Sequence, residues 1–230
     1  MESVALVISP HPDDAEIAMG GTMAALLQQG MRVVVADLTD GEPTPYGSVE
    51  KRRQEAEVAS KVLGIIERRQ LTLKNREIFD TVENRNVVAG LIRDVRPQVL
   101  FGPYWDDAHP DHVQAAALVE SARFYAKFVK SELPHDPWYP SKHLHFFSTH
   151  IKVRYQPSFI FDISEHLEVK MAAISAYESQ FVTHEGNRKR LEEIRTEASY
   201  WGHQVGVSAG EPFMCRESIK LSTAAALCNV

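Results

Sequence analysis

Apolar residues follow two alternating patterns in the first half of the chain. Short continuous apolar runs, typical of parallel strands buried on both faces, alternate with segments in which apolar residues recur every three or four positions, as in helices. The predicted strands are Val4–Ile8, Val33–Leu38, Ile65–Leu73 and Val99–Phe101. The predicted helices cover about Glu16–Gln28, Ser48–Leu63 and Thr81–Val95. This alternation predicts a doubly wound α/β fold: a mostly parallel, Rossmann-like sheet with helices on both faces.

The second half of the chain is less regular. We expect a helix from His112 to about Lys130 and further helices over about Ser164–Gln180 and Arg188–Trp201. Strands are expected at His143–Phe147 and Phe159–Phe161. No internal repeat or linker interrupts the sequence. We therefore predict a single domain over residues 1–230, in which the C-terminal part elaborates the sheet.

Two loops rich in histidine and aspartate follow the first and the fourth predicted strands. Their metal-competent residues are His11, Asp13 and Asp14 in the first loop and His109, Asp111 and His112 in the second. Imidazole and carboxylate groups are the usual ligands of a catalytic zinc ion. Either loop alone is better explained as an ordinary turn. Because the C-terminal ends of parallel strands share one edge of a sheet, the two loops together predict a metal site.

Composition narrows the classes of protein to consider. Of the 230 residues 44% are hydrophobic and 24% charged, as in ordinary globular proteins. The formal net charge of −6 makes the chain a poor partner for nucleic acid. No apolar run approaches the length of a membrane span, and the start does not resemble a secretion signal. We therefore expect a cytoplasmic protein that binds neither nucleic acid nor membrane.

Specific motifs connect the two loops to a known family. The segment Pro10–Glu16 reads PHPDDAE, Gly20–Thr22 reads GGT, and His109–His112 reads HPDH. Together they resemble the PIG-L/LmbE family of zinc-dependent N-deacetylases, and the resemblance covers nearly the whole chain. Later stretches resemble the bacterial branch that includes the N-acetylglucosaminyl-malate deacetylases of bacillithiol synthesis. These stretches are Pro157–Phe159, Asp162–Glu165, Ala176–Phe181 and Glu211–Phe213.

The resemblance implies a role for each residue of the two loops. His11, Asp14 and His112 would bind Zn²⁺, although a His/Asp site also tolerates Fe²⁺, Mn²⁺ or Co²⁺. Asp13 would be the general base. His109 would stabilise the oxyanion and help to protonate the leaving amine. Asp111 would accept a hydrogen bond from the His109 ring and so orient it.

On the substrate side the resemblance is less complete. Arg52 occupies the position of a substrate-binding arginine, and Asn75 replaces an aspartate that holds a sugar hydroxyl in the family. Glu42 either contacts substrate or only caps its loop. Ala108 stands where the bacillithiol enzymes are expected to have an arginine.

The implied reaction is hydrolysis of the N-acetyl group of a small N-acetylglucosamine-containing molecule, with N-acetylglucosaminyl-malate as one candidate. N-acetylated chitooligosaccharides and other acylated amino sugars are alternatives, as is a non-catalytic sugar-binding protein. A nucleotide-binding protein is disfavoured because the first loop is acidic rather than glycine-rich. The family also implies a homo-oligomer, often a hexamer.

Of the histidines outside the two loops, three are further candidates for a functional role. His143 and His145 alternate, so they share one face of the predicted strand. A partly exposed strand face is the favoured interpretation, with a second metal site as the alternative. His150 is a further candidate for lining the substrate pocket.

Overall fold

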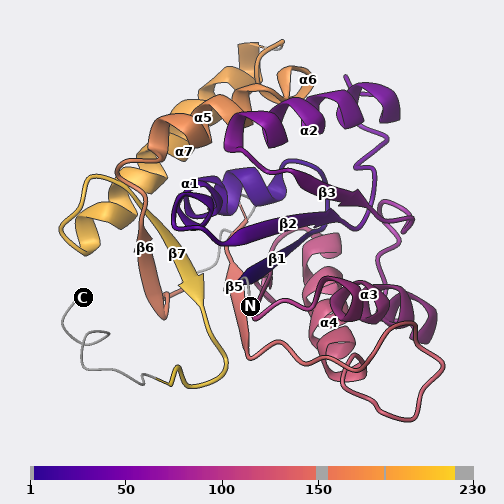
Figure 1. Ribbon diagram of the computed structural model, residues 1–230. Coiled ribbons are helices and arrows are strands. Elements are labelled where there is room, and N and C mark those ends of the chain that lie inside the picture. The colour runs from indigo at the N-terminus through magenta and orange to yellow at the C-terminus, as the bar shows by residue number, and fades with distance from the viewer. Residues whose placement is uncertain (1–2, 149–154, 184, 221–230) are drawn as a thin grey trace.

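The computed structural model describes residues 3–148, 155–183 and 185–220 (Figure 1). A seven-stranded sheet runs through this part of the chain, in the order β3-β2-β1-β4-β5-β7-β6. Strands β1 to β5 pair in parallel, and β7 is antiparallel to both of its neighbours, β5 and β6. The strands are β1 (Val4–Ser9), β2 (Arg32–Asp37), β3 (Glu67–Gln70), β4 (Val99–Pro103), β5 (Lys142–Phe146), β6 (Phe159–Asp162) and β7 (Gly210–Met214).

Helices cover both faces of the sheet. They are α1 (Asp14–Gln28), α2 (Val49–Leu63), α3 (Val82–Val95), α4 (Pro110–Tyr125), α5 (Leu167–Ser175), α6 (Glu178–Phe181) and α7 (Glu185–Gln204). Helices α3 and α4 lie together on one face, whereas α1, α2, α5 and α7 lie on the other (Figure 1). Each face has its own hydrophobic core. The predicted doubly wound α/β fold is confirmed.

Capping residues in the sequence explain why the ends of α2 and the start of α3 were predicted correctly. The hydroxyl of Ser48 accepts a hydrogen bond from the Lys51 amide at the start of α2, and that of Thr81 accepts one from the Asn84 amide at the start of α3. Gly64 ends α2 in the left-handed conformation, with φ 82°. In the described residues, no helix has both the length and the apolar character of a membrane span.

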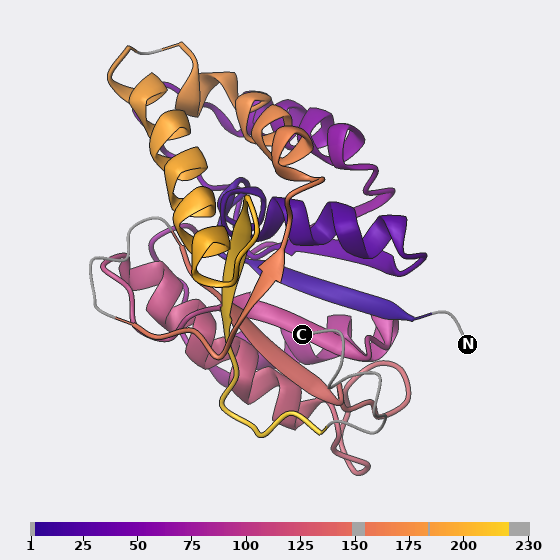
Figure 2. The ribbon, with the colours of Figure 1, turned by 90° about the vertical axis from the view of Figure 1, so that its left-hand side faces the viewer.

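The C-terminal half departs from the prediction in several places. Helix α4 ends at Tyr125, before the expected end at about Lys130. The helix expected over Ser164–Gln180 is two helices, α5 and α6, interrupted at the fully buried Tyr177. Strand β7 was not predicted, yet it is an interior strand that joins β6 to the parallel part of the sheet (Figure 2). The segment between β6 and β7 packs on α1 and α2 through α5.

The expectation of a partly exposed face on β5 is wrong. His143 and His145 do share a face, but they are 3% and 1% exposed. Their side chains meet Glu120 of α4, the helix that follows the second histidine-rich loop. His150 lies outside the described residues.

Candidate metal centre and active site

The two histidine-rich loops meet at the C-terminal ends of β1 and β4, where the strand order reverses direction. The first loop leads directly into α1, and the Ser9 hydroxyl supports it by donating a hydrogen bond to the His11 carbonyl at 2.7 Å. Asp13 has a φ of 111°, a backbone conformation that side-chain-bearing residues rarely adopt. Such strain is concentrated at functional sites, where the surrounding structure maintains it.

The three predicted metal ligands lie together, with one carboxylate oxygen of Asp14 close to both histidine rings. Oδ2 of Asp14 lies 3.0 Å from Nδ1 of His11 and 3.2 Å from Nε2 of His112. All three residues are buried, and one donor atom of each lies within 4.8 Å of the others. Two imidazoles and a carboxylate form the donor set of a catalytic zinc site, which leaves a position open. The residues present therefore fit a divalent metal ion.

A second layer of carboxylates orients both histidine rings. Nε2 of His11 lies 3.0 Å from Oδ2 of Asp111, and Nδ1 of His112 lies 2.9 Å from Oδ2 of Asp107. Metal-ligating histidines typically bind a carboxylate through their other ring nitrogen. The Asp111 carboxylate thus holds His11, where an orienting bond to His109 was expected. Asp107 was not predicted, although its place in the loop after β4, beside the other predicted residues, could have indicated it.

The carboxylates control the protonation of these ligands in the metal-free chain. Burial lowers the pKa of His11, but its bonds to Asp111 and Asp14 outweigh this effect and raise the pKa to about 9. In the same way the nearby Asp14 and Asp107 raise the pKa of His112 to about 10. Burial alone would raise the pKa of Asp14, yet the charges of the two histidines hold it well below its usual range. Because only a neutral imidazole binds a metal ion, metal binding at this site would release the ring protons of both histidines.

Asp13 lies beside the triad and pairs with Arg52. Its Oδ2 is 3.1 Å from Nη2 of the buried Arg52. Burial raises the pKa of Asp13 to about 7, because it outweighs the opposing charge of Arg52. A carboxylate with a pKa near neutrality suits a general base. Arg52 keeps two buried nitrogens, Nε and Nη1, without a hydrogen-bond partner, and it lines the same cavity as Asp13.

His109 stacks on His112, with ring centroids 4.6 Å apart. Its Nδ1 accepts a hydrogen bond from the Asp111 amide at 3.2 Å. Burial and the neighbouring histidines lower the pKa of His109 to about 4, so the ring is neutral near pH 7. A neutral ring that accepts through Nδ1 carries its proton on Nε2. His109 can therefore act as a hydrogen-bond donor towards a reacting oxygen or nitrogen.

A cavity of about 210 Å³ opens beside the triad, and its lining is mostly polar. Asn75, the residue expected to bind a sugar hydroxyl, lines it together with Arg76 and Gln180, which were not predicted. Glu42 is not among the lining residues: its carboxylate accepts hydrogen bonds from the amide and hydroxyl of Thr44 and so caps its own loop. Gln180 belongs to α6, so the C-terminal insertion contributes to the cavity.

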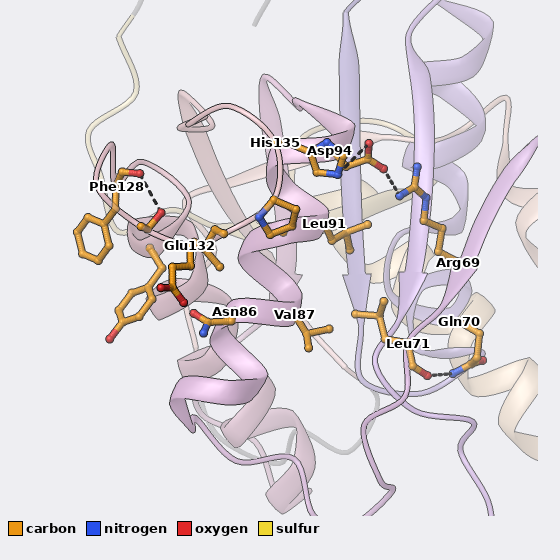
Figure 3. A pocket seen from close by; sticks show the side chains of 15 residues that line it. Arg69, Gln70, Leu71, Asn86, Val87, Leu91, Asp94, Phe128, Glu132 and His135 are labelled. Carbon is orange, nitrogen blue, oxygen red and sulfur yellow. Dashed lines mark hydrogen bonds and ion pairs between the residues drawn. The ribbon is translucent and has the colours of Figure 1, made fainter.

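A larger cavity, of about 1010 Å³, lies elsewhere (Figure 3). It is bounded by β3, α3 and the segment after α4, and the Arg69–Asp94 ion pair lies at its rim. None of the three candidate metal-binding groups in the described residues lies in it. The predicted chemistry therefore belongs to the smaller cavity at the sheet edge.

Comparison with known proteins identifies a family whose model matches the part of the chain that contains both histidine-rich loops. The family model described as "PIG-L: GlcNAc-PI de-N-acetylase" matches residues 6–123. A diacetylchitobiose deacetylase of Thermococcus kodakarensis is 34% identical over 194 residues, covering 76% of this chain and 69% of that protein. A probable N-acetyl-α-D-glucosaminyl L-malate deacetylase 2 of Bacillus anthracis is 27% identical over 210 residues, covering 85% and 90%. The crystal structure of the conserved protein TT1542 from Thermus thermophilus matches with a TM-score of 0.89 and 33% identity, covering 97% and 99%.

Proposed function

Because the chain belongs to the PIG-L family, we propose that it is a zinc-dependent deacetylase of a small N-acetylglucosamine-containing molecule. One observation carries this proposal: His11, Asp14 and His112 converge on one point of a polar cavity, with Asp13 beside them. The reaction would hydrolyse the acetamide and release acetate and a free amine. Iron, manganese or cobalt could replace zinc, since the donor set suits several divalent ions.

The triad, Asp13 and His109 each have a role in this reaction. A metal ion held by His11, Asp14 and His112 would polarise the amide carbonyl and make water more acidic. Asp13 removes a proton from the attacking water, a contribution typically worth about 10²- to 10⁴-fold in rate. The neutral His109 ring, through Nε2–H, donates a hydrogen bond to the developing oxyanion. The proton that Asp13 takes from the water then passes to the leaving amine, which returns Asp13 to its starting form.

Binding of the sugar falls to the other lining residues. The unpartnered Nε and Nη1 of Arg52 offer buried donors for substrate hydroxyl or carbonyl oxygens, while Asp13 holds the same guanidinium in place. Asn75 offers an amide to a hydroxyl without adding charge. Because Asp13 already neutralises Arg52, an acidic substrate would need a further cation, and Arg76 is the lining residue that could supply it.

Two substrates follow from the relatives. N-acetylglucosaminyl-malate is the first candidate, supported by the similarity to the Bacillus anthracis protein and by the positive charge of Arg76 in the cavity. Diacetylchitobiose is the second candidate, favoured by the 34% identity to the Thermococcus kodakarensis protein and by Ala108, which offers no charge for malate. An N-acetylated amino sugar is common to both.

The test is release of primary amine from N-acetylglucosamine, N-acetylglucosaminyl-malate and diacetylchitobiose. The purified chain is assayed after zinc loading, after chelation and after zinc is restored. We expect amine from at least one of the three compounds, lost on chelation and recovered with zinc. A zinc-loaded chain that releases no amine would overturn the substrate class, and undiminished activity after complete metal removal would overturn the metal dependence.

A further inference from the structure

A second group of buried metal-competent side chains lies between the sheet and α4. It consists of His143 and His145 of β5 and Glu120 of α4, with one donor atom of each within 4.8 Å of the others. Glu120 follows His112 by eight residues on the same helix, which corresponds to about 12 Å along its axis. The group is therefore separate from the site that carries the proposed deacetylation.

Its geometry repeats that of the first triad. Oδ2 of Asp14 is shared by two histidines in the first site, and here Oε2 of Glu120 lies 3.1 Å from Nδ1 of His143 and 4.0 Å from Nε2 of His145. Both imidazoles are almost completely buried, whereas the glutamate side chain is 42% exposed. An ion could therefore reach the group from the glutamate side.

His145 is held in the form that a metal requires. Its Nδ1 lies 3.0 Å from the Pro103 carbonyl oxygen, which can only accept, so the ring proton is on Nδ1. The lone pair of Nε2 then faces the group, and Nε2 has no hydrogen-bond partner in the structure. A backbone carbonyl that fixes the second nitrogen of a ligating histidine is the usual support in metal sites.

The cations nearest the group have other partners. Of the neighbouring cations, Arg123 is paired with Glu217, and Arg216 stacks on Trp105 with its guanidinium 4.1 Å from the ring centroid.

We propose that Glu120, His143 and His145 bind a second divalent transition-metal ion, independently of the first site. Two imidazoles and one carboxylate favour zinc, cobalt or nickel over calcium or magnesium, which prefer oxygen ligands. The ion would link β5 to α4 and so stabilise the packing of that helix. A plain ion pair between Glu120 and His143 is the competing explanation, and it leaves the Nε2 lone pair of His145 unused.

The test counts zinc ions bound to the full chain. The protein is stripped with a chelator, loaded with excess Zn²⁺, freed of unbound metal by gel filtration and analysed for metal. We expect about two ions per chain in the wild type and about one in Glu120→Gln/His145→Gln. His203→Gln, which removes an exposed histidine outside both groups, serves as the matched control and keeps both ions.

A second variant isolates the proposed site. Asp14→Asn/His112→Asn removes two ligands of the first triad and is expected to retain one zinc ion, which raises its melting temperature. Adding Glu120→Gln to this variant abolishes both the ion and the shift. One ion in the wild type, none in Asp14→Asn/His112→Asn, or an unchanged count in Glu120→Gln/His145→Gln would each overturn the proposal. If Glu120→Gln/His145→Gln does not fold, the count in Asp14→Asn/His112→Asn decides alone.

Discussion

Asp13 combines a strained backbone with a buried carboxylate. Its φ of 111° is tolerated by asparagine and aspartate better than by most other side chains. The surrounding loop keeps this conformation, and the carboxylate stays next to Arg52. The choice of substitution therefore determines whether an experiment reports on chemistry or on loop conformation.

For this reason the informative variant is Asp13→Asn. Asparagine keeps the backbone conformation and the size of the side chain but cannot take a proton. We expect kcat to fall by about 10²- to 10⁴-fold while zinc content and melting temperature stay near those of the wild type. Asp13→Ala should also lower the melting temperature, because alanine adopts a positive φ only at a cost. Full activity of Asp13→Asn would show that another group is the base.

Asp107 and Asp106 are neighbours that make a matched pair. Asp107 is bonded to the His112 ring, whereas Asp106 is exposed. We expect Asp107→Ala to weaken zinc binding about 10- to 100-fold, because an unsupported ring loses its orientation, and Asp106→Ala to leave it unchanged. Competition with a chromophoric chelator measures both affinities. Equal affinities in the two variants would contradict the supporting role of Asp107.

At this scale the sequence predicted which side chains meet but not how their atoms pair. The histidine and aspartate clusters follow strands that end at one edge, so their proximity could be read from the order of the elements. Whether Asp111 bonds His11 or His109 depends on side-chain rotation within a crowded pocket. Spacing along the chain carries no information about that rotation.

Among the elements, α1 is the most unusual. Its helical conformation is interrupted at Met19, where φ is −145°. Beyond this kink the carboxylate of Glu211, from β7, accepts hydrogen bonds from the amides of Gly21 and Thr22 at 3.0 and 2.7 Å. A Cβ at Gly21 would lie 2.7 Å from that of Ile163, so only glycine allows this approach. The break and its partners fix α1 beneath the metal loop.

Glu211 also neutralises Lys170, whose Nζ lies 2.6 Å away, and both residues are buried. We expect Glu211→Gln to destabilise the fold by about 3–5 kcal/mol, because it leaves a buried ammonium without its counter-charge. Glu168→Gln breaks the largely exposed pair with Arg195 and should cost at most about 1 kcal/mol. Urea unfolding of the two variants measures the difference. Similar losses in both would contradict the role given to burial.

The edge strand β3 is held partly by charges. The hydrogen bond from Arg69 is the main reason why the pKa of Asp94 lies below its ordinary value. A lowered pKa in the folded state stabilises the protein above the unfolded pKa, and this contribution disappears as the pH falls through the folded pKa. We therefore expect a shallower loss of stability below about pH 4 in Arg69→Gln than in the wild type. Denaturant unfolding between neutral and acidic pH measures both slopes, and identical slopes would refute the linkage.

The apolar pattern predicted the strands whose own sequence is clearly apolar. Strands β1, β2 and β4 are continuous apolar runs, so burial and sequence agree. Strand β7 reads GEPFM, in which glycine, glutamate and proline obscure any strand pattern. It is a strand because β5 and β6 offer hydrogen bonds on both sides. Such an element depends on tertiary structure and could not be predicted from local sequence.

The whole molecule places its chemistry where the strand order reverses, and this followed from the sequence alone. For the assembled state we propose a homo-oligomer, with a hexamer as the expected form. Light scattering on the purified chain should give a multiple of 25.9 kDa. A single species at 25.9 kDa over a range of concentrations would disprove the assembly.

The interior position of β7 has a consequence for how the chain folds during synthesis. Strand β7 pairs with β5 and β6, and its Glu211 bonds to Gly21, 190 residues earlier. The ribosome must therefore deliver Met214 before the sheet is complete and before α1 has its final partner. Contacts this distant in sequence slow folding. Until then the nascent protein exposes the unpaired edge of β5, a period in which chaperones would prevent aggregation.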